Sequence, residues 1–297
     1  MNITDKINDI LTEKPGDGFF KYMSKNLFKR FGDHNITQTA GQLAFFTLLS
    51  FFPFVVFLNY LISSFNLTKN VVIELLSEIF PYQIAEIMGN YVEYVSGLGN
   101  NVGIISAGII VAVFSASRSV RALSIAINQA YNISDKRFFL LRLILSMIFT
   151  VVLGIIVMLC LVAVTAGREW IYRIILLLDL PVSWLTTIST MKWVVVFSAF
   201  FVILLLIYYT VPLTRVKLKD ILPGTFLTII FNFVLTYGYS IYISYFSNFS
   251  VLYGSMGVAL LLALWLYFMG IFIILGAEFN SALAERKYFN AVNSVKN

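Results

Sequence analysis

Long stretches without a charged side chain alternate with shorter charged segments along the chain. The five uncharged stretches are residues 35–68, 94–117, 143–167, 193–214 and 221–277. Each of the first four is long enough for one helix that crosses a bilayer, which takes about 20 apolar residues. The last has room for two such helices and a turn. The pattern predicts an all-α, polytopic membrane protein with six transmembrane helices.

Three further segments combine apolar side chains with charges, as interfacial helices do. In residues 18–31 apolar side chains recur at every fourth position and basic ones fill another face; the apolar ones are Phe19, Met23, Leu27 and Phe31. This pattern indicates either a basic amphipathic helix on the inner leaflet or a short cytosolic helix packed on the membrane domain. Residues 70–95 and 170–184 are predicted to lie at the opposite, outer interface.

Basic residues are concentrated in every other segment between the predicted spans. Alternate segments, beginning with the N-terminal one, hold 17 of the 21 Lys and Arg residues, and the others hold four. Because cytoplasmic loops carry the excess of Lys and Arg, both termini are predicted to be cytoplasmic. The chain then divides into a basic cytoplasmic or interfacial segment (1–34), a six-helix membrane domain (35–285) and a cytoplasmic tail (286–297).

Composition agrees with a membrane protein and excludes several other classes. Of the 297 residues 59% are hydrophobic and 12% charged, and mean hydropathy is +0.86. With one cysteine and one histidine, a disulfide scaffold and a zinc site are both excluded. The net charge of +6 suits a protein that faces an anionic inner leaflet, so the expected partners are membrane lipids and no nucleic acid.

Three charged residues fall inside or at the ends of predicted spans. Arg118 lies about 24 Å along a helix that begins near residue 102, which places it within the bilayer, and Arg121 follows one turn later. Either they are interface anchors or they belong to a functional site. Glu278 lies at a comparable depth, so we expect it to pair with Arg118 or Arg121, as a structural ion pair or in an anion-binding or gating role.

The fifth predicted span carries a polar side chain at every fourth position. The row consists of Thr228, Asn232, Thr236, Ser240, Ser244 and Asn248. It marks a face turned away from lipid, which either makes hydrogen bonds between helices or lines a hydrated path for a substrate.

Enzyme motifs are not evident in the sequence. His34 has no Ser and Asp at triad spacing, the cytoplasmic acids are scattered, and there is no Gly-Lys-Ser/Thr nucleotide loop. We therefore expect no catalytic residues, no metal and no cofactor.

Several short motifs resemble the YihY/BrkB family of bacterial inner-membrane proteins, once labelled ribonuclease BN. They are TAGQLAFF at 39–46 with Ser50 and Pro53, Ser117-Arg118 with Asn128 and Tyr131, LPG at 222–224, YGS at 253–255 and LGAEFN at 275–280. The resemblance implies a six-helix protein of the bacterial plasma membrane and supplies no agreed catalytic residues. Nothing in these residues supports the ribonuclease label. The family's recurrent polar positions match here at Arg118, Asn128, Tyr253, Gly254, Glu278 and Asn280.

Three functions remain open from the sequence. The first is transport or flipping of a lipid or other amphiphile, anionic ones included; the second is a non-catalytic component that organises envelope machinery; the third is a membrane-bound enzyme. The candidate substrate-binding residues are Arg118, Arg121, Asn128, Asn232, Thr236, Tyr253, Glu278 and Asn280. The substrate, the coupling ion and the oligomeric state are left open.

Overall fold

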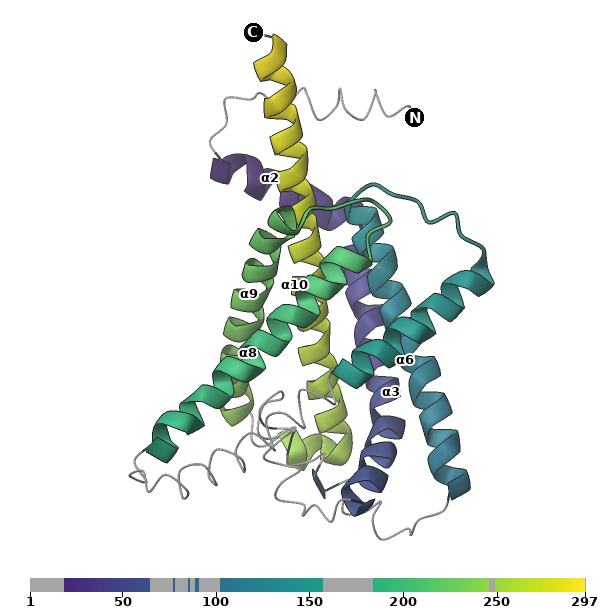
Figure 1. The fold of residues 1–297 in the computed structure, drawn as a ribbon. Coiled ribbons are helices and arrows are strands. Elements are labelled where there is room, and N and C mark those ends of the chain that lie inside the picture. The colour runs from purple at the N-terminus through teal and green to yellow at the C-terminus, as the bar shows by residue number, and fades with distance from the viewer. Residues whose placement is uncertain are drawn as a thin grey trace.

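The computed structural model of the chain is a bundle of long helices (Figure 1). It describes residues 19–64, 77, 85, 89–90, 102–156, 184–245 and 249–296. The helices are α2 (Phe19–Asp33), α3 (Ile36–Ser64), α6 (Val102–Ala130), the helix Phe139–Ile156, α8 (Trp184–Thr210), α9 (Leu218–Tyr245) and α10 (Phe249–Lys296). Within these ranges there is no strand, in agreement with the predicted all-α class.

Each of the six predicted spans falls on one of the long helices. Four helical segments are long and apolar enough to cross a membrane: Ser106–Ala130, Phe139–Ile156, Leu218–Ile243 and Ala259–Asn290. A shorter apolar segment, Val196–Thr210, lies in α8. The segments predicted to be interfacial at 70–95 and 170–184 lie almost entirely outside the described residues.

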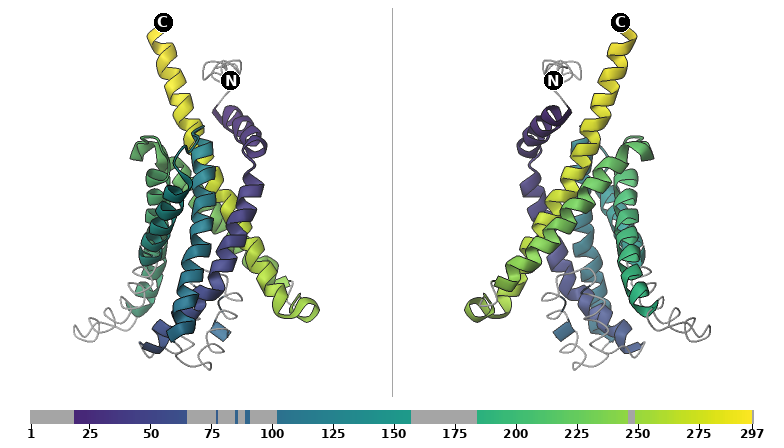
Figure 2. Two further views of the ribbon diagram at one scale, coloured as in Figure 1. Left: turned by 90° about the vertical axis from the view of Figure 1, so that its right-hand side faces the viewer. Right: turned by 90° about the vertical axis from the view of Figure 1, so that its left-hand side faces the viewer.

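α10 is the central helix of the bundle. Its 48 residues correspond to about 72 Å of helix, so it extends past the other helices at the end where the C-terminus lies (Figures 1 and 2). It packs against α2, α3, α6 and α9. The main core cluster collects buried side chains from α3, α6, α8, α9 and α10, including Ile36, Ile127, Leu204 and Ile274.

α3 and α6 pack along each other through small and hydroxyl side chains. Ala122, Ala126 and Ala130 of α6 are buried, which lets the backbones approach closely. The Thr47 and Ser119 hydroxyls lie 2.7 Å apart, and Ser119 also donates to the Leu43 carbonyl at 3.3 Å. Such bonds satisfy hydroxyl groups that could not find water inside a membrane bundle.

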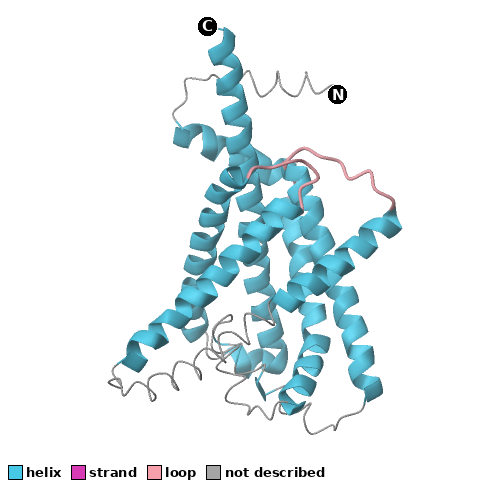
Figure 3. Cartoon of the chain, viewed as in Figure 1, coloured by secondary structure: helices cyan, strands magenta, loops and turns pink. Residues whose placement is uncertain are grey.

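α2, the C-terminal part of α10 and the two described loops gather at one end of the bundle. These loops, residues 131–138 and 211–217, run past the ends of α6 and α8 (Figure 3). α2 is joined to α3 by His34 and Asn35 alone, and Asn35 has a φ of 50°. This left-handed conformation, which asparagine tolerates better than most residues, sets the sharp angle between α2 and α3.

The predicted helix at 18–31 is confirmed as α2; its position relative to the inner leaflet stays a prediction. Met23 is buried, and Phe31 packs against the main core cluster, so the predicted apolar face lies largely on the protein. This agrees with a helix packed on the membrane domain. A second apolar pair, Phe20 and Phe28, is 86% and 84% exposed, respectively.

Candidate functional site

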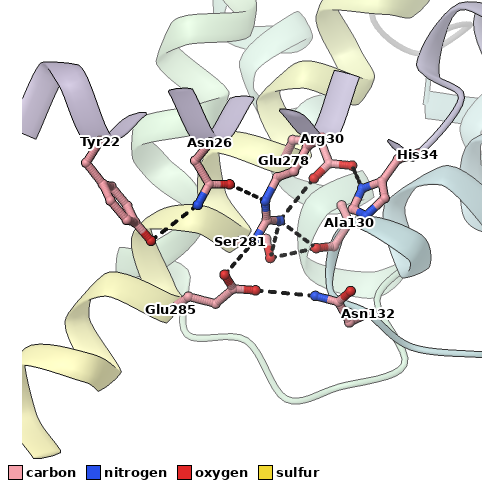
Figure 4. A network of polar contacts seen from close by, with 9 residues as sticks. All are labelled: Tyr22, Asn26, Arg30, His34, Ala130, Asn132, Glu278, Ser281 and Glu285. Carbon is pink, nitrogen blue, oxygen red and sulfur yellow. Dashed lines mark hydrogen bonds and ion pairs between the residues drawn. The ribbon is translucent and has the colours of Figure 1, made fainter. Parts of the chain in front are cut away.

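Arg30 of α2 is the centre of a buried polar network that joins three helices (Figure 4). Its guanidinium donates to Glu278 Oε2 at 3.1 Å and to Glu285 Oε2 at 2.6 Å, both on α10. It also donates to the Ala130 carbonyl, the last residue of α6, at 3.1 Å. The Nε atom donates to Asn26, one turn earlier in α2, at 2.5 Å. Arg30 thereby fastens α2 to α6 and to α10.

Neutral groups complete this network, which we call the Arg30 network and which comprises Tyr22, Asn26, Arg30, His34, Ala130, Asn132, Glu278, Ser281 and Glu285. Ser281 Oγ donates to the Ala130 carbonyl at 2.7 Å. Asn132 Nδ2, just after α6, lies 3.4 Å from Glu285 Oε1. Arg30, Glu278 and Glu285 therefore each have more than one partner, the condition under which buried charges are tolerated.

Both carboxylate oxygens of Glu278 are paired with groups from the N-terminal part of the chain. Its side chain has no exposed surface; Oε2 accepts from Arg30, and Oε1 lies 2.5 Å from His34 Nδ1. The His34 side chain is 15% exposed. The imidazole consequently links a fully buried carboxylate to the surface.

The network contains two carboxylates and one guanidinium. Burial lowers the pKa of Arg30, but the attraction of Glu285 and Glu278 outweighs it and leaves the pKa raised, so Arg30 stays charged. Burial, aided by Asp220 and Glu278, raises the pKa of the neighbouring Tyr131 to about 12, so this phenol stays neutral. One more positive charge would make the network neutral, and the His34 imidazole is the group in contact that can supply it.

The expected pairing of Glu278 with Arg118 or Arg121 is wrong. Glu278 bonds to Arg30 and His34, whereas the Arg118 guanidinium lies over the rings of Phe114 and Phe46, 5.1 and 5.7 Å from their centroids. Arg121 lies over the Phe139 ring at 5.1 Å. The physical reason is the direction in which the Arg118 side chain leaves α6. Arg118 is exposed on α6 and its neighbours Ser117 and Ser119 are buried, so α6 turns the arginine outward.

Asn128 holds the end of α8 in place. Its side chain is buried; Oδ1 accepts from the Leu213 N–H at 2.8 Å, and Nδ2 lies 3.3 Å from the Val211 carbonyl. These bonds cap the chain where α8 stops, around Pro212. The contacts of this candidate substrate ligand are those of a structural residue.

Two members of the α9 polar row, Thr228 and Asn232, make hydrogen bonds within the bundle, Thr228 to other helices and Asn232 to the backbone of α9 itself. Thr228 is buried; its hydroxyl lies 2.8 Å from the Tyr208 hydroxyl and 3.3 Å from the Phe272 carbonyl. Asn232, also buried, donates to the Thr228 carbonyl at 2.9 Å. Thr236 is half-buried. Hydrogen bonding within the bundle thus accounts for Thr228 and Asn232.

Asn280 lies where α9 and α10 approach most closely. Its side chain is fully buried, and Oδ1 accepts from the Gly224 N–H at 2.7 Å, next to Pro223 inside α9. Asn280 Nδ2 is buried without a hydrogen-bond partner among the described residues. A Cβ on Gly224 would overlap both Asn280 and the Gly276 carbonyl. The LPG and LGAEFN motifs therefore meet in one helix contact.

The remaining candidates are placed as follows. Tyr253 lies in the first turns of α10, in a stretch whose side chains are outside the described set. Arg30 and His34, which hold Glu278, were missed as site residues. In the sequence they were marked only by the spacing of four between Arg30 and His34, the one histidine of the chain.

Among the described residues, no three His, Cys, Asp or Glu side chains are grouped as metal ligands.

Comparison with known proteins gives one family and several relatives. The sequence model of the virulence factor BrkB family matches residues 27–296. The putative ribonuclease-like protein YfkH of Bacillus subtilis (strain 168) is 29% identical over 270 residues, which cover 89% of this chain and 95% of YfkH. The UPF0761 membrane protein of Xanthomonas oryzae pv. oryzae (strain PXO99A) is 25% identical over 267 residues, 88% of this chain. The chain spans 60% of the length of that relative. No solved structure matches the chain.

Proposed function

Because the chain belongs to the virulence factor BrkB family of integral membrane proteins, we propose that it binds an anionic lipid or similar amphiphile beside α6 and moves it across the bilayer. In this proposal six helices cross the bacterial plasma membrane, and both termini are cytoplasmic. The family membership supports the membrane location, and the arginines on α6 support the chemistry of the ligand.

The position of Arg118 is the observation that carries the proposal. Arg118 is exposed within the apolar segment Ser106–Ala130, and it lies over two aromatic rings. Arg121 contacts Phe139, the first residue of the next helix, so Arg118 lies about 4.5 Å farther from the loop. A guanidinium at this depth costs free energy unless it meets a counter-charge, and a lipid phosphate offers bidentate hydrogen bonds.

A third arginine, Arg142, has a side-chain N–H without a hydrogen-bond partner among the described residues. Arg142 follows Phe139 by three residues and so starts from the same turn of its helix. Its Nε is buried and has no hydrogen-bond partner among the described residues. A buried N–H without a partner is costly, and an anionic oxygen would satisfy it. Arg118, Arg121 and Arg142 form the head-group site in this proposal.

The proposal includes no ribonuclease chemistry. The ribonuclease-like name is that of YfkH. In this chain each carboxylate oxygen of Glu278 faces a basic side chain, Arg30 at Oε2 and His34 at Oε1, and the proposal gives this carboxylate a structural role.

The experiment compares Arg118→Gln and Arg118→Lys in the full chain. For each we would measure co-purified anionic lipid by mass spectrometry, transfer of a fluorescent anionic lipid in proteoliposomes, and thermal unfolding in detergent. We expect Arg118→Gln to lose about tenfold in bound lipid, the value of one charge-assisted hydrogen bond, and to unfold normally. Arg118→Lys should retain part of the binding.

Lys136→Gln is the matched control, because it removes one exposed positive charge from the neighbouring loop. It should change neither lipid content nor transfer. Unaltered lipid content and transfer in Arg118→Gln would refute the proposal and leave the arginine as an interface anchor.

A non-catalytic role in organising envelope machinery has an observation of its own. α2 and the C-terminal part of α10 lie together at one end, with Phe20, Phe28 and Tyr288 exposed. If this surface docks a protein partner, Phe28→Ser should fail to replace the parent protein in cells that lack it, whereas Arg118→Gln should replace it. The opposite result supports lipid transfer.

A further inference from the structure

We propose that His34 and Glu278 form a proton-binding site and that its proton controls the docking of α2 on α10. The inference concerns the Arg30 network and does not depend on which substrate, if any, the protein moves.

Polar contacts form a large part of the docking surface of α2, beside the packing of Met23 and Phe31 and the Arg286 guanidinium over the Phe19 and Tyr22 rings. The buried residues of this helix are Met23, Asn26 and Arg30, and two of the three belong to the network. Two of its four phenylalanines, Phe20 and Phe28, are largely exposed. A helix whose contact surface contains a buried charged network responds to a change of one charge in that network.

The proton has a defined place and a route. Glu278, when ionised, can only accept, so its contact with His34 requires the hydrogen to be on Nδ1. A proton taken from water then binds Nε2, and the imidazole becomes a cation beside the carboxylate. The 15% exposure of His34 gives solvent access that the fully buried Glu278 lacks.

The charges around the pair come from every helix packed on it. Arg30 lies on α2, Glu285 on α10 and the neutral Tyr131 just after α6. At the start of α9, Asp220 is 2.6 Å from Lys287 and thus has its own counter-charge. With His34 protonated, the two cations balance Glu278 and Glu285. With His34 neutral, the network keeps one net negative charge, which the fully buried Glu278 and the partly exposed Glu285 share.

The direction of the effect follows from this balance. With the proton on His34 the network is neutral and α2 docks; as pH rises and the proton leaves, docking weakens. One linked proton changes the ratio of docked to undocked protein by at most about tenfold per pH unit. The two-residue connection at His34 and Asn35 is the hinge about which α2 would move.

Distances between two spin labels, measured by electron–electron double resonance, can test the pH-dependent docking of α2 in the full chain. The labels are placed at Ser24→Cys on α2 and Tyr288→Cys on α10, both exposed, on a Cys160→Ser background in lipid nanodiscs. We expect one short distance at about pH 5.5 and a second, longer population at about pH 8.5, values on either side of the imidazole range. The undocked fraction should rise at least several-fold.

Three variants decide whether the Arg30 network causes the pH dependence of the distance between the labels. His34→Gln cannot be charged and should show the alkaline distribution at both pH values. Adding Glu285→Gln removes the excess negative charge and should restore docking at both. Asp135→Asn, in a local ion pair with Arg137 outside the network, is the control and should titrate like the parent. A distance distribution that does not change with pH in the parent, or an unaltered pH dependence in His34→Gln, overturns the proposal.

Discussion

Arg30 and Glu278 are both buried, and each depends on the charge of the other. The Arg30 side chain is 9% exposed and Glu278 is not exposed at all, so neither ion can be hydrated if its partner is removed. Arg30 has a second carboxylate partner in Glu285, whereas among the residues that the structure describes Glu278 has His34 alone besides Arg30. The two residues are therefore not equivalent in the stability of the fold.

Arg30→Gln is expected to destabilise the protein more than Glu278→Gln. The first leaves two carboxylates without their guanidinium, a loss of about 3–5 kcal/mol for a buried pair broken on one side. The second leaves Arg30 bonded to Glu285 and should cost less. Thermal unfolding in detergent measures both.

A double-mutant cycle provides the control for this prediction. Arg30→Gln and Glu278→Gln should be strongly non-additive, because they are in contact. Arg118→Gln and Glu278→Gln should add within about 0.5 kcal/mol, because Arg118 contacts aromatic rings instead. Measurable coupling between Arg118 and Glu278 would contradict the geometry described above.

For single residues, the sequence marks Glu278 and Asn280 as unusual but does not identify their partners. Hydropathy gives the depth of Glu278, yet depth does not say which way a side chain points around its helix. Its partner Arg30 lies 248 residues away, in a segment whose other basic residues are exposed. Only the packing of α2 across the end of the bundle brings the two together.

α9 and α10 pack so closely that one glycine decides their contact. A Cβ on Gly276 would overlap the Thr228 and Tyr208 hydroxyls and crowd the Gly224 carbonyl. Because these hydroxyls hydrogen-bond to each other and to the α10 backbone, they cannot move aside without losing bonds. Small residues at such positions are what allows helices to associate in membranes.

We expect Gly276→Ala to destabilise the protein by about 1–3 kcal/mol, the usual cost of overpacking, and to lower its yield from membranes. Gly238→Ala on α9 is the matched control, since a Cβ at this position would meet no atom within 4 Å. That variant should be neutral or slightly stabilising because alanine favours helix. Equal stability of the two variants would show that the helices are farther apart than described.

α2 presents two faces, and this leads to a prediction about its depth. Met23, Asn26 and Arg30 contact the bundle, while the exposed Phe20 and Phe28 border a row of lysines. Aromatic side chains next to lysines are typical of a helix at the inner leaflet. A spin label at position 28 should therefore be accessible to oxygen, and one at Lys29 to a water-soluble nickel complex. Equal accessibility to the nickel complex at both positions would place α2 in the cytosol.

For the whole molecule, apolar periodicity and charge-free length predict the elements well, because helices that cross a bilayer must be long and apolar throughout. The long helices follow from this constraint, and the helix at 18–31 follows from the spacing of four between its apolar residues. The close contact of Gly224, Gly276 and Asn280 does not, since hydropathy carries no information on which helices are neighbours. The family resemblance marks these positions, and packing explains them.

The last prediction concerns the orientation of the molecule in the membrane. The loops 131–138 and 211–217 lie at the same end as α2 and the C-terminal part of α10 (Figure 3), so the positively charged segments share one side. By the positive-inside rule, that side is predicted to face the cytoplasm. On a Cys160→Ser background, Lys136→Cys and Lys217→Cys should be protected from an impermeant maleimide in intact cells, whereas Glu78→Cys and Asp179→Cys should react. If positions 136 and 217 both react, the orientation is the reverse of the predicted one and the fold is unaffected. If one of them reacts and the other does not, the arrangement of the helices described above is contradicted.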